Sequence, residues 1–237
     1  KDYDVKKHSA AENFQYLVRL FLNEFDGSFF VPAFKKADFE SINETYIEKQ
    51  LNELPEAALK IVMSVNTVDS NKNIPPQIFI DLINNMARKY QIVIIFAGIN
   101  NDRIVIDKIK KEIGGTVLTF DLCGKTNLVQ LNALFQQVDF LINLDNGMGH
   151  FAAAAGCPTV TIFTNSPLVQ FKPLHKKTLT VGGSCGCIGE CNKNLRETCG
   201  FKCLYDISVD MIMEKVDIMV RQLQGQTYEG TMKNEKN

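Results

Sequence analysis

The segment Val138 to Thr164, VDFLINLDNGMGHFAAAAGCPTVTIFT, places an acidic residue, two glycines and a histidine between two apolar runs. The alanine run 152–155 favours a helix and is too long for a hairpin loop, and Gly156 then provides a helix stop. The segment therefore predicts a compact strand–helix–strand unit. Its helix exposes free N–H groups directly after Asp145.

Asp145, Gly147 and His150 have the types and spacing that suit a phosphorylated sugar. A helix N-terminus carries a partial positive charge that attracts phosphate or diphosphate, and glycine lets the backbone approach it. His150 could donate to the same oxygens, whereas Asp145 would repel phosphate and suits sugar hydroxyls better. The alternative is a tight turn in which Asp145 caps the helix and His150 lies at the surface.

Two further charged residues follow strand-like runs. Lys72 lies in SVNTVDSNKNIPP. It could neutralise a diphosphate from the opposite wall of a cleft, although a lone lysine in a polar loop is usually only solvated. Asp102 follows FAGINN and could bind ribose hydroxyls, as acidic residues do in nucleotide-binding folds. A helix N-cap explains Asp102 equally well.

Five of the seven cysteines form a cluster with the spacing C-x-C-x3-C-x7-C-x3-C. Thiolates are zinc ligands, but the paired C-x2-C knuckles of common zinc sites are absent. Structural thiols, a metal site or, in an oxidising compartment, a disulfide all fit this cluster. The candidate zinc ligands are Cys185, Cys187, Cys191, Cys199 and Cys203.

The 237 residues carry a net charge of −1, from 26 basic and 27 acidic side chains, and 45% of them are hydrophobic. Nucleic-acid-binding proteins usually have a basic excess, which is missing here. No apolar run approaches the roughly 18 residues that a membrane span needs, and no signal peptide opens the chain. We therefore expect a cytoplasmic protein without a nucleic-acid partner. The first residue is a lysine, which suggests processing or a fragment of a longer protein.

Runs of Val and Ile alternate with segments of helical periodicity. We expect strands within 58–65, 91–98, 116–120, 139–144 and 159–163, and helices over 75–90, 102–113, 127–136, the alanine run and 208–223. This alternation is typical of an α/β protein with a parallel sheet covered by helices on both faces. Ligands of such sheets bind beyond the carboxyl ends of the strands. The segments at these ends are small and polar: 66–73, 98–102, 121–126, 145–150 and 164–167.

The combination of these motifs resembles glycosyltransferase family 9, the lipopolysaccharide heptosyltransferases. The C-terminal half of that family has a Gly-Lys-Thr-type segment, then Asp-Ser/Thr-Gly-x-x-His, an alanine-rich helix and Gly-x-Pro. The matching residues are Gly124, Lys125, Thr126, Asp145, Gly147, His150, Gly156 and Pro158. The loop around Lys72 and the stretch CLYDISVDMIMEKV are also similar, so the resemblance covers residues 57–220. Asn146 replaces the usual Ser or Thr, and Asn73-Ile74 replaces the usual Arg-Trp.

The resemblance implies the GT-B architecture, in which two Rossmann-like domains enclose the active site. This chain would then contain the end of a mostly absent N-terminal acceptor domain (1–27), a linker and helix (28–55), the Rossmann-like domain that binds the nucleotide sugar (56–223) and a polar tail (224–237). Helices are expected at 11–24 and 40–53. The family's general base, an aspartate of the N-terminal domain, has no counterpart here, so no catalytic residue is assigned.

The resemblance also implies an inverting transfer of heptose or a related sugar from a nucleotide-diphosphate donor similar to ADP-heptose. The acceptor would be a lipopolysaccharide or lipooligosaccharide core at the inner face of the inner membrane, and no cofactor would be required. The implied donor-binding residues are Lys72, Asn66, Thr67, Asp102, Leu122, Gly124, Asp145, Asn146, Gly147 and His150.

Individual roles follow from the same resemblance. Lys72 and His150 would bind the diphosphate, Asp145 the sugar and Asp102 the ribose, while main-chain atoms of 122–124 would line the base pocket.

Two other functions fit the sequence as well. The first is a non-catalytic module that binds a sugar nucleotide, which agrees with the missing base. The second is a zinc-stabilised interaction domain built on the cysteine cluster.

Overall fold

The computed structural model describes residues 51, 54–55, 58–115, 117–183 and 200–225 of the chain. The predicted helices at 11–24 and 40–53 lie outside these residues, except for Leu51, as do four of the five clustered cysteines. The sheet and its helices extend from Leu59 to Leu223. The proposed domain limits stay predictions.

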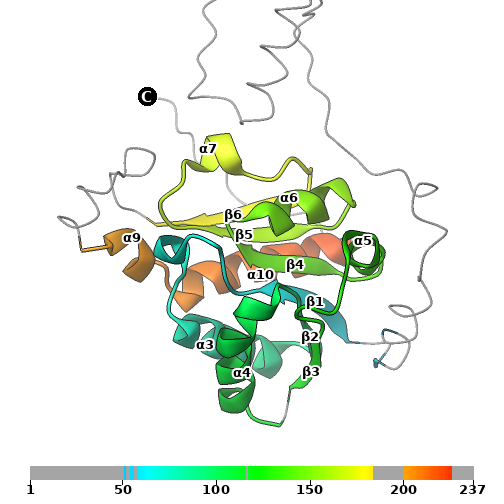
Figure 1. The fold of residues 1–237 in the computed structure, drawn as a ribbon. Helices are drawn as coiled ribbons and strands as arrows, with labels where there is room; N and C mark the ends of the chain where they lie inside the picture. Colours follow the sequence, from blue (N-terminus) through cyan, green and yellow to red (C-terminus); the bar gives the residue numbers. More distant parts are fainter. Residues whose placement is uncertain (1–50, 52–53, 56–57, 116, 184–199, 226–237) are drawn as a thin grey trace, which may run out of the picture.

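The sheet has six parallel strands in the order β3-β2-β1-β4-β5-β6 (Figure 1). The strands are β1 (Leu59–Ser64), β2 (Ile92–Phe96), β3 (Leu118–Asp121), β4 (Phe140–Leu144), β5 (Thr159–Phe163) and β6 (Thr178–Gly182). All neighbouring strands pair in parallel, which confirms the predicted type of sheet. β6 is not among the predicted strands, because its segment TLTVG has a single buried side chain and no continuous apolar run.

Helices cover both faces of the sheet, as predicted. One face carries α3 (Pro76–Lys89), α4 (Arg103–Glu112) and α10 (Val209–Leu223), and the other carries α5 (Leu128–Phe135) and α6 (Gly147–Ala154) (Figure 1). The described parts of the connections contain four short helices: η3 (Ser70–Lys72), η4 (Asn100–Asp102), α7 (Leu168–Phe171) and α9 (Lys202–Tyr205). α7 and α9 are absent from the prediction, because four residues do not display a helical period.

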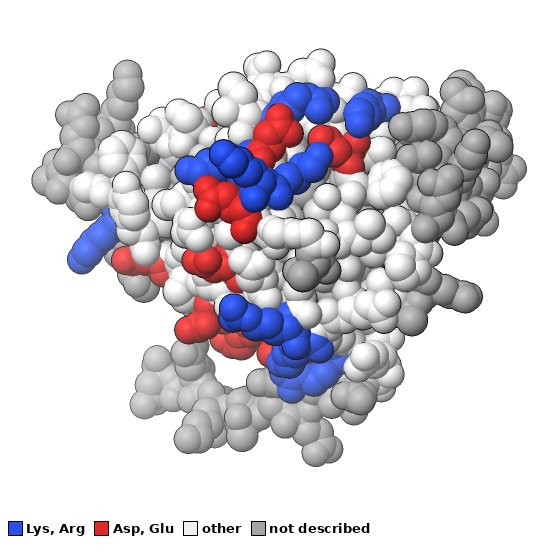
Figure 2. Space-filling view, turned by 90° about the horizontal axis from the view of Figure 1, so that it is seen from below, with Lys and Arg blue, Asp and Glu red and all other residues white. Residues whose placement is uncertain are grey.

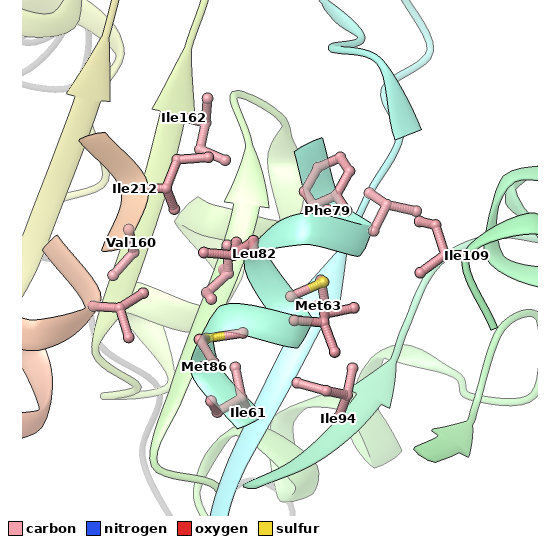
Figure 3. Close-up of a cluster of buried hydrophobic side chains, with 14 of the residues drawn as sticks. Ile61, Met63, Phe79, Leu82, Met86, Ile94, Ile109, Val160, Ile162 and Ile212 are labelled. Atoms are coloured by element: carbon pink, nitrogen blue, oxygen red, sulfur yellow. The ribbon is translucent and has the colours of Figure 1, made fainter. Parts of the chain in front are cut away.

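The core lies on both faces of the sheet, because successive strand side chains point to opposite sides. In β1, Ile61 and Met63 belong to the cluster under α3 and α10, whereas Val62 belongs to the cluster under α5 and α6. Burying each such side chain stabilises the fold by about 1.5–3 kcal/mol. Figure 3 shows part of the first cluster, with Phe79, Leu82 and Met86 of α3 against the sheet and Ile212 of α10 beside Val160 and Ile162 of β5.

The strand order reverses between β1 and β4. Sequential strands extend outward from β1 on one side and from β4 on the other. In a doubly wound sheet with this order, a crevice opens at the carboxyl ends of the two central strands. The segments 66–73 and 145–150 leave β1 and β4 at this crevice. The topology therefore brings the segments that contain Lys72 and Asp145 together.

Gly156 stops the helix α6 just after its last residue, Ala154, and its C-cap, Ala155, as predicted. Gly156 has a φ of 85°, which side chains other than glycine rarely tolerate. Its N–H donates to Ala153 (3.0 Å), and the N–H of Cys157 donates to Ala152 (2.9 Å). These two bonds form a Schellman motif. The motif satisfies the carbonyl groups at the end of the helix and leads the chain into β5.

Charged side chains of both signs are mixed over the face shown in Figure 2, without a broad area of one sign. Ion pairs such as Lys89–Asp217 (2.6 Å) and Lys110–Asp121 (3.2 Å) join the two kinds of charge. The described residues on this face therefore form no basic patch of the kind that binds nucleic acids. Among the described residues, no helix combines the length and apolar character needed to cross a bilayer.

Candidate functional site

A pocket of about 420 Å³ lies at the crevice between β1 and β4. Four predicted site residues line it: Asn66, Thr67, Asp102 and Asn146. They come from the loops after β1, β2 and β4. The pocket thus brings together residues that lie as far as 80 positions apart in the chain.

The pocket also has apolar walls that no motif indicated. Val68 and Ile99 lie in the loops after β1 and β2 and are 98% and 57% exposed, and Met148 lies in the first turn of α6. Exposed apolar side chains beside polar groups suit a ligand that has a flat ring and a polar body. Ile99 and Met148 fall within the segments at the strand ends, but their residue types alone do not distinguish them from core residues.

Asn146, and not Asp145, caps α6. Its Oδ1 accepts from the N–H of Met148 (3.0 Å). Its Nδ2 donates to the carbonyl of Asn66 (3.0 Å) and to Oγ of Ser64 (3.2 Å). Asn caps a helix as well as Ser or Thr does. The departure from the family motif therefore preserves the cap and adds a connection from β4 to the loop after β1.

Lys72 and Asp145 form an ion pair. Nζ of Lys72 lies 2.7 Å from Oδ2 of Asp145, and the two side chains are 25% and 9% exposed. The predicted roles assigned them to different parts of a ligand, the diphosphate and the sugar. Without a ligand, each charge is neutralised by the other. A bound diphosphate would compete with Asp145 for the same ammonium group, which has three N–H donors.

His150 lies one turn into α6, beside this ion pair. Desolvation by the surrounding residues lowers the pKa of His150 below the usual 6.5. The charge of Asp145 and a hydrogen bond to the backbone of Phe171 act in the opposite direction but are smaller effects. This shift favours the neutral form of the His150 imidazole. A neutral imidazole can donate one hydrogen bond to an anion, and a nearby anion would favour its protonation.

The two glycines in the first turn of α6 have different surroundings. A Cβ atom added to Gly149 would lie 2.7 Å from Nδ2 of Asn143 and 3.2 Å from Cγ of Pro173. One added to Gly147 would meet no atom within 4 Å. Packing therefore requires a glycine at position 149. At position 147 the protein itself has room for a side chain, which leaves space for a ligand.

The segment Leu122–Gly124 has a more structural character than its predicted role implies. Its three N–H groups donate to Phe96, Asp121 and Gly98 at 2.9, 3.0 and 2.8 Å. The Leu122 side chain is buried in the core, and neither Leu122 nor Gly124 lines the pocket. A contact between this main chain and a nucleobase stays a prediction. The N–H groups of this segment already donate hydrogen bonds within the protein.

The carboxylate of Asp121 stabilises this segment. It accepts from the N–H of Cys123, and Lys110 (3.2 Å) and Arg103 (3.4 Å) lie beside it. Burial acts to raise the pKa of Asp121. The hydrogen bonds from Cys123 and Lys110 outweigh this effect, so the pKa lies below its usual value. Arg103 also donates to the carbonyl of Cys123 (2.7 Å), which ties the segment to α4.

The zinc prediction falls mainly outside the described residues. Of the five candidates only Cys203 is described, and it is the buried residue of α9. Within the described ranges, no group of three or more His, Cys, Asp or Glu side chains could hold a metal ion. The metal state of Cys185, Cys187, Cys191 and Cys199 stays a prediction.

Comparison with known proteins decides the family. The model of glycosyltransferase family 9 (heptosyltransferase) matches residues 9–204. This chain belongs to glycosyltransferase family 9. The match begins 48 positions before residue 57, where the resemblance read from the motifs begins. The predicted family is confirmed.

Two curated heptosyltransferases are similar over part of the chain. Lipopolysaccharide core heptosyltransferase OpsX of Haemophilus influenzae is 31% identical over 87 residues, which cover 35% of this chain and 24% of that protein. Lipopolysaccharide heptosyltransferase 3 of Escherichia coli is 30% identical over 86 residues, which cover 36% of this chain and 25% of that protein.

Solved structures confirm the predicted Rossmann-like fold of a GT-B glycosyltransferase. The family 9 glycosyltransferase of Veillonella parvula matches with a TM-score of 0.74 and 15% identity over 94% of this chain and 62% of that one. ADP-heptose lipopolysaccharide heptosyltransferase II of E. coli matches with a TM-score of 0.68 and 17% identity, over 85% and 57% of the two chains. The chain thus spans less than two thirds of the length of these relatives.

Proposed function

We propose that this chain forms the donor-binding half of an inverting glycosyltransferase. The enzyme transfers heptose or a related sugar from a nucleotide-diphosphate donor to a lipopolysaccharide or lipooligosaccharide core. One observation carries the proposal: Lys72, Asp145 and the first turn of α6 meet beside the pocket at the β1/β4 crevice. A cation, a carboxylate and free helical N–H groups together match a diphosphate joined to a sugar.

The arrangement supports one orientation of the donor. The diphosphate lies over the first turn of α6, where Lys72, His150 and the open space at Gly147 surround it. The ribose lies in the pocket beside Asp102. The base lies farther along the same wall, beside Ile99 and the loop after β3. The sugar then lies at Asp145.

The chemistry required of this half is the stabilisation of a leaving group. When the bond between the sugar C1 and the phosphate oxygen breaks, negative charge develops on the departing diphosphate. The ammonium group of Lys72 and the helix N-terminus are fixed donors for that charge, so no metal ion or cofactor is required. Lys72 shifts from Asp145 toward the diphosphate. The carboxylate of Asp145 then accepts a hydrogen bond from a sugar hydroxyl. The base that activates the acceptor comes from an N-terminal domain or a partner.

Relatives support this choice of donor and acceptor. The two curated relatives are named as lipopolysaccharide heptosyltransferases, and one similar solved structure is E. coli heptosyltransferase WaaC with ADP (TM-score 0.53, 15% identity). By analogy, the donor is similar to ADP-heptose. The enzyme acts in the cytoplasm, peripherally at the inner face of the inner membrane where its glycolipid acceptor lies.

Isothermal titration with ADP, UDP and GDP, with and without magnesium, tests the proposal. We expect one nucleotide to bind independently of the metal, and Lys72→Ala to weaken its binding by roughly 10- to 100-fold, as for the loss of a charged hydrogen bond. Lys111→Ala removes the same charge from an exposed position on α4 and serves as the control. If no nucleotide binds, or if the two variants weaken binding equally, the proposal is wrong.

A further inference from the structure

A directional chain of hydrogen bonds connects the loop after β1 to the carboxylate of Asp102. The N–H of Thr67 donates to Oδ1 of Asn73 (2.8 Å), and Nδ2 of Asn73 donates to Oδ1 of Asn66. Nδ2 of Asn66 then donates to Oδ1 of Asp102 (2.9 Å). The N–H of Ile99 donates to the other carboxylate oxygen (2.9 Å).

The direction of these bonds determines the orientation of both amides. Because Oδ1 of Asn73 accepts from Thr67, its Nδ2 faces Asn66. Because Oδ1 of Asn66 accepts that bond, its Nδ2 must face Asp102. Reversal of either amide would place two donors or two acceptors in contact, which costs free energy when the groups are buried.

These hydrogen bonds hold Asp102 in a fixed position at the wall of the pocket. The residue is 9% exposed, and each carboxylate oxygen accepts one bond from the protein. A carboxylate has about four acceptor sites, so each oxygen can accept one more hydrogen bond. Because Asp102 lines the pocket, its two oxygens match the two adjacent hydroxyls of a ribose. They offer nothing to a sugar that lacks them.

We propose that Asn73 and Asn66 are positioning residues that give the pocket its selectivity for a ribose diol, by holding Asp102 in the orientation that accepts both hydroxyls. The proposal rests on the proposed nucleotide-sugar function. Asn73 stands at the position where the family motif usually has Arg. The hydrogen bonds through the Asn73 and Asn66 amides, which we call the amide relay, therefore depend on a residue in which this protein departs from the family motif.

The test compares the affinities of the full chain for ADP and for 2′,3′-dideoxy-ADP. The two ligands share the base and the diphosphate, so their ratio isolates the diol. We expect the wild-type chain to prefer ADP by roughly 10- to 100-fold, as for hydrogen bonds to a charged group. In Asn73→Ala this preference should fall to about twofold or less, mainly because ADP binds more weakly, if the relay orients Asp102.

Asn73→Asp provides a sharper variant. It keeps the shape of the side chain and an acceptor for the N–H of Thr67, but it removes the donor to Asn66. The Asn66 amide would then turn its donor away from Asp102 and its oxygen toward it. The added negative charge affects both ligands equally and cancels in the ratio. We expect Asn73→Asp to lose the diol preference as fully as Asn73→Ala does.

Asn71→Ala is the matched control, because Asn71 lies in the same loop, donates from its side chain to Asp69 (2.9 Å) and does not line the pocket. It should keep the wild-type preference. If Asn73→Ala and Asn73→Asp weaken both ligands equally and keep the ratio, Asn73 only supports the loop and the relay proposal is wrong. If the wild-type chain binds neither ligand, the proposed function itself is wrong, and the relay proposal with it.

Discussion

Two neighbouring regions of the crevice handle polarity in opposite ways. In the amide region, formed by Asn66, Asn73 and Asp102, the hydrogen bonds run between neutral amides and end on one carboxylate. In the ion-pair region, formed by Lys72, Asp145 and His150, full charges neutralise each other at a partly exposed surface. The amide region is ready for a ligand as it stands. In the proposed donor complex, Lys72 of the ion-pair region exchanges Asp145 for the diphosphate.

Substitution of a carboxylate by its amide distinguishes the two regions most strongly at Asp102. Asp102→Asn places an N–H donor against either Asn66 or the N–H of Ile99, both of which donate. We expect the free energy of unfolding to fall by about 1–3 kcal/mol and ADP binding to weaken by roughly tenfold or more. Denaturant unfolding and calorimetric titration measure the two effects. Unchanged stability would show that the amide network is not rigid.

The glycines of α6 provide the next contrast. Gly149→Ala brings a methyl group against Asn143 and should lower the free energy of unfolding by about 1–3 kcal/mol through overpacking. Gly147→Ala should change stability by less than about 0.5 kcal/mol but weaken ADP binding by roughly tenfold, because the methyl group occupies the space beside the helix N-terminus. Unfolding curves and titrations of both variants decide this. Full ADP affinity in Gly147→Ala would place the diphosphate elsewhere.

In the ion-pair region, the change of aspartate to asparagine should strengthen ADP binding, whereas Asp102→Asn should weaken it. Asp145→Asn frees Lys72 from its partner and removes a negative charge near the diphosphate. Since a partly exposed pair contributes about 0.2–1 kcal/mol, we expect ADP to bind roughly two- to fivefold more tightly. In an enzyme completed by the half that supplies the base, transfer of the sugar should nevertheless be lost, because no carboxylate holds the sugar. Weaker ADP binding in Asp145→Asn, measured calorimetrically, would refute the exchange of partners by Lys72.

Salt should separate the two regions without any mutation. Charge attraction between exposed groups is screened as ionic strength rises, whereas hydrogen bonds of a ribose in a pocket are screened much less. We expect the affinity for ADP to fall several-fold between 0.05 and 0.5 M NaCl, with little change in the ratio of ADP to 2′,3′-dideoxy-ADP affinities. A ratio that falls in parallel with the affinity would mean that the diol is bound through exposed charges.

The smallest expected effect is the pH dependence of His150. In the free protein its pKa is lowered, mainly by desolvation, and a bound diphosphate raises it. Between these two pKa values binding takes up a proton, so affinity rises as pH falls. An ADP-sugar, whose diphosphate does not titrate near neutrality, should bind more tightly at about pH 5.5 than at about pH 7.5. His150→Gln should remove this trend and His175→Gln should keep it.

The fold was largely predictable from the sequence because buried strands and amphipathic helices have distinct periods. The exceptions are short or mixed in pattern, such as β6 and α7. Lys72 and Asp145 were selected as candidate site residues from their positions after strands. Their pairing was not predictable, because it joins residues 73 positions apart and depends on the strand order. Asn73 has no charge and no periodic signal, so only its contacts reveal it.

The most direct test of donor binding at the β1/β4 crevice is to locate a bound nucleotide by NMR. Amide spectra of the isotopically labelled chain would be followed during titration with ADP. We predict that the largest shifts occur at the N–H groups of Gly147 to His150 and at Ile99, with no shifts at the far end of α10. Shifts confined to residues outside the β1/β4 crevice, or none at saturating ADP, would contradict the claim that this crevice binds the donor.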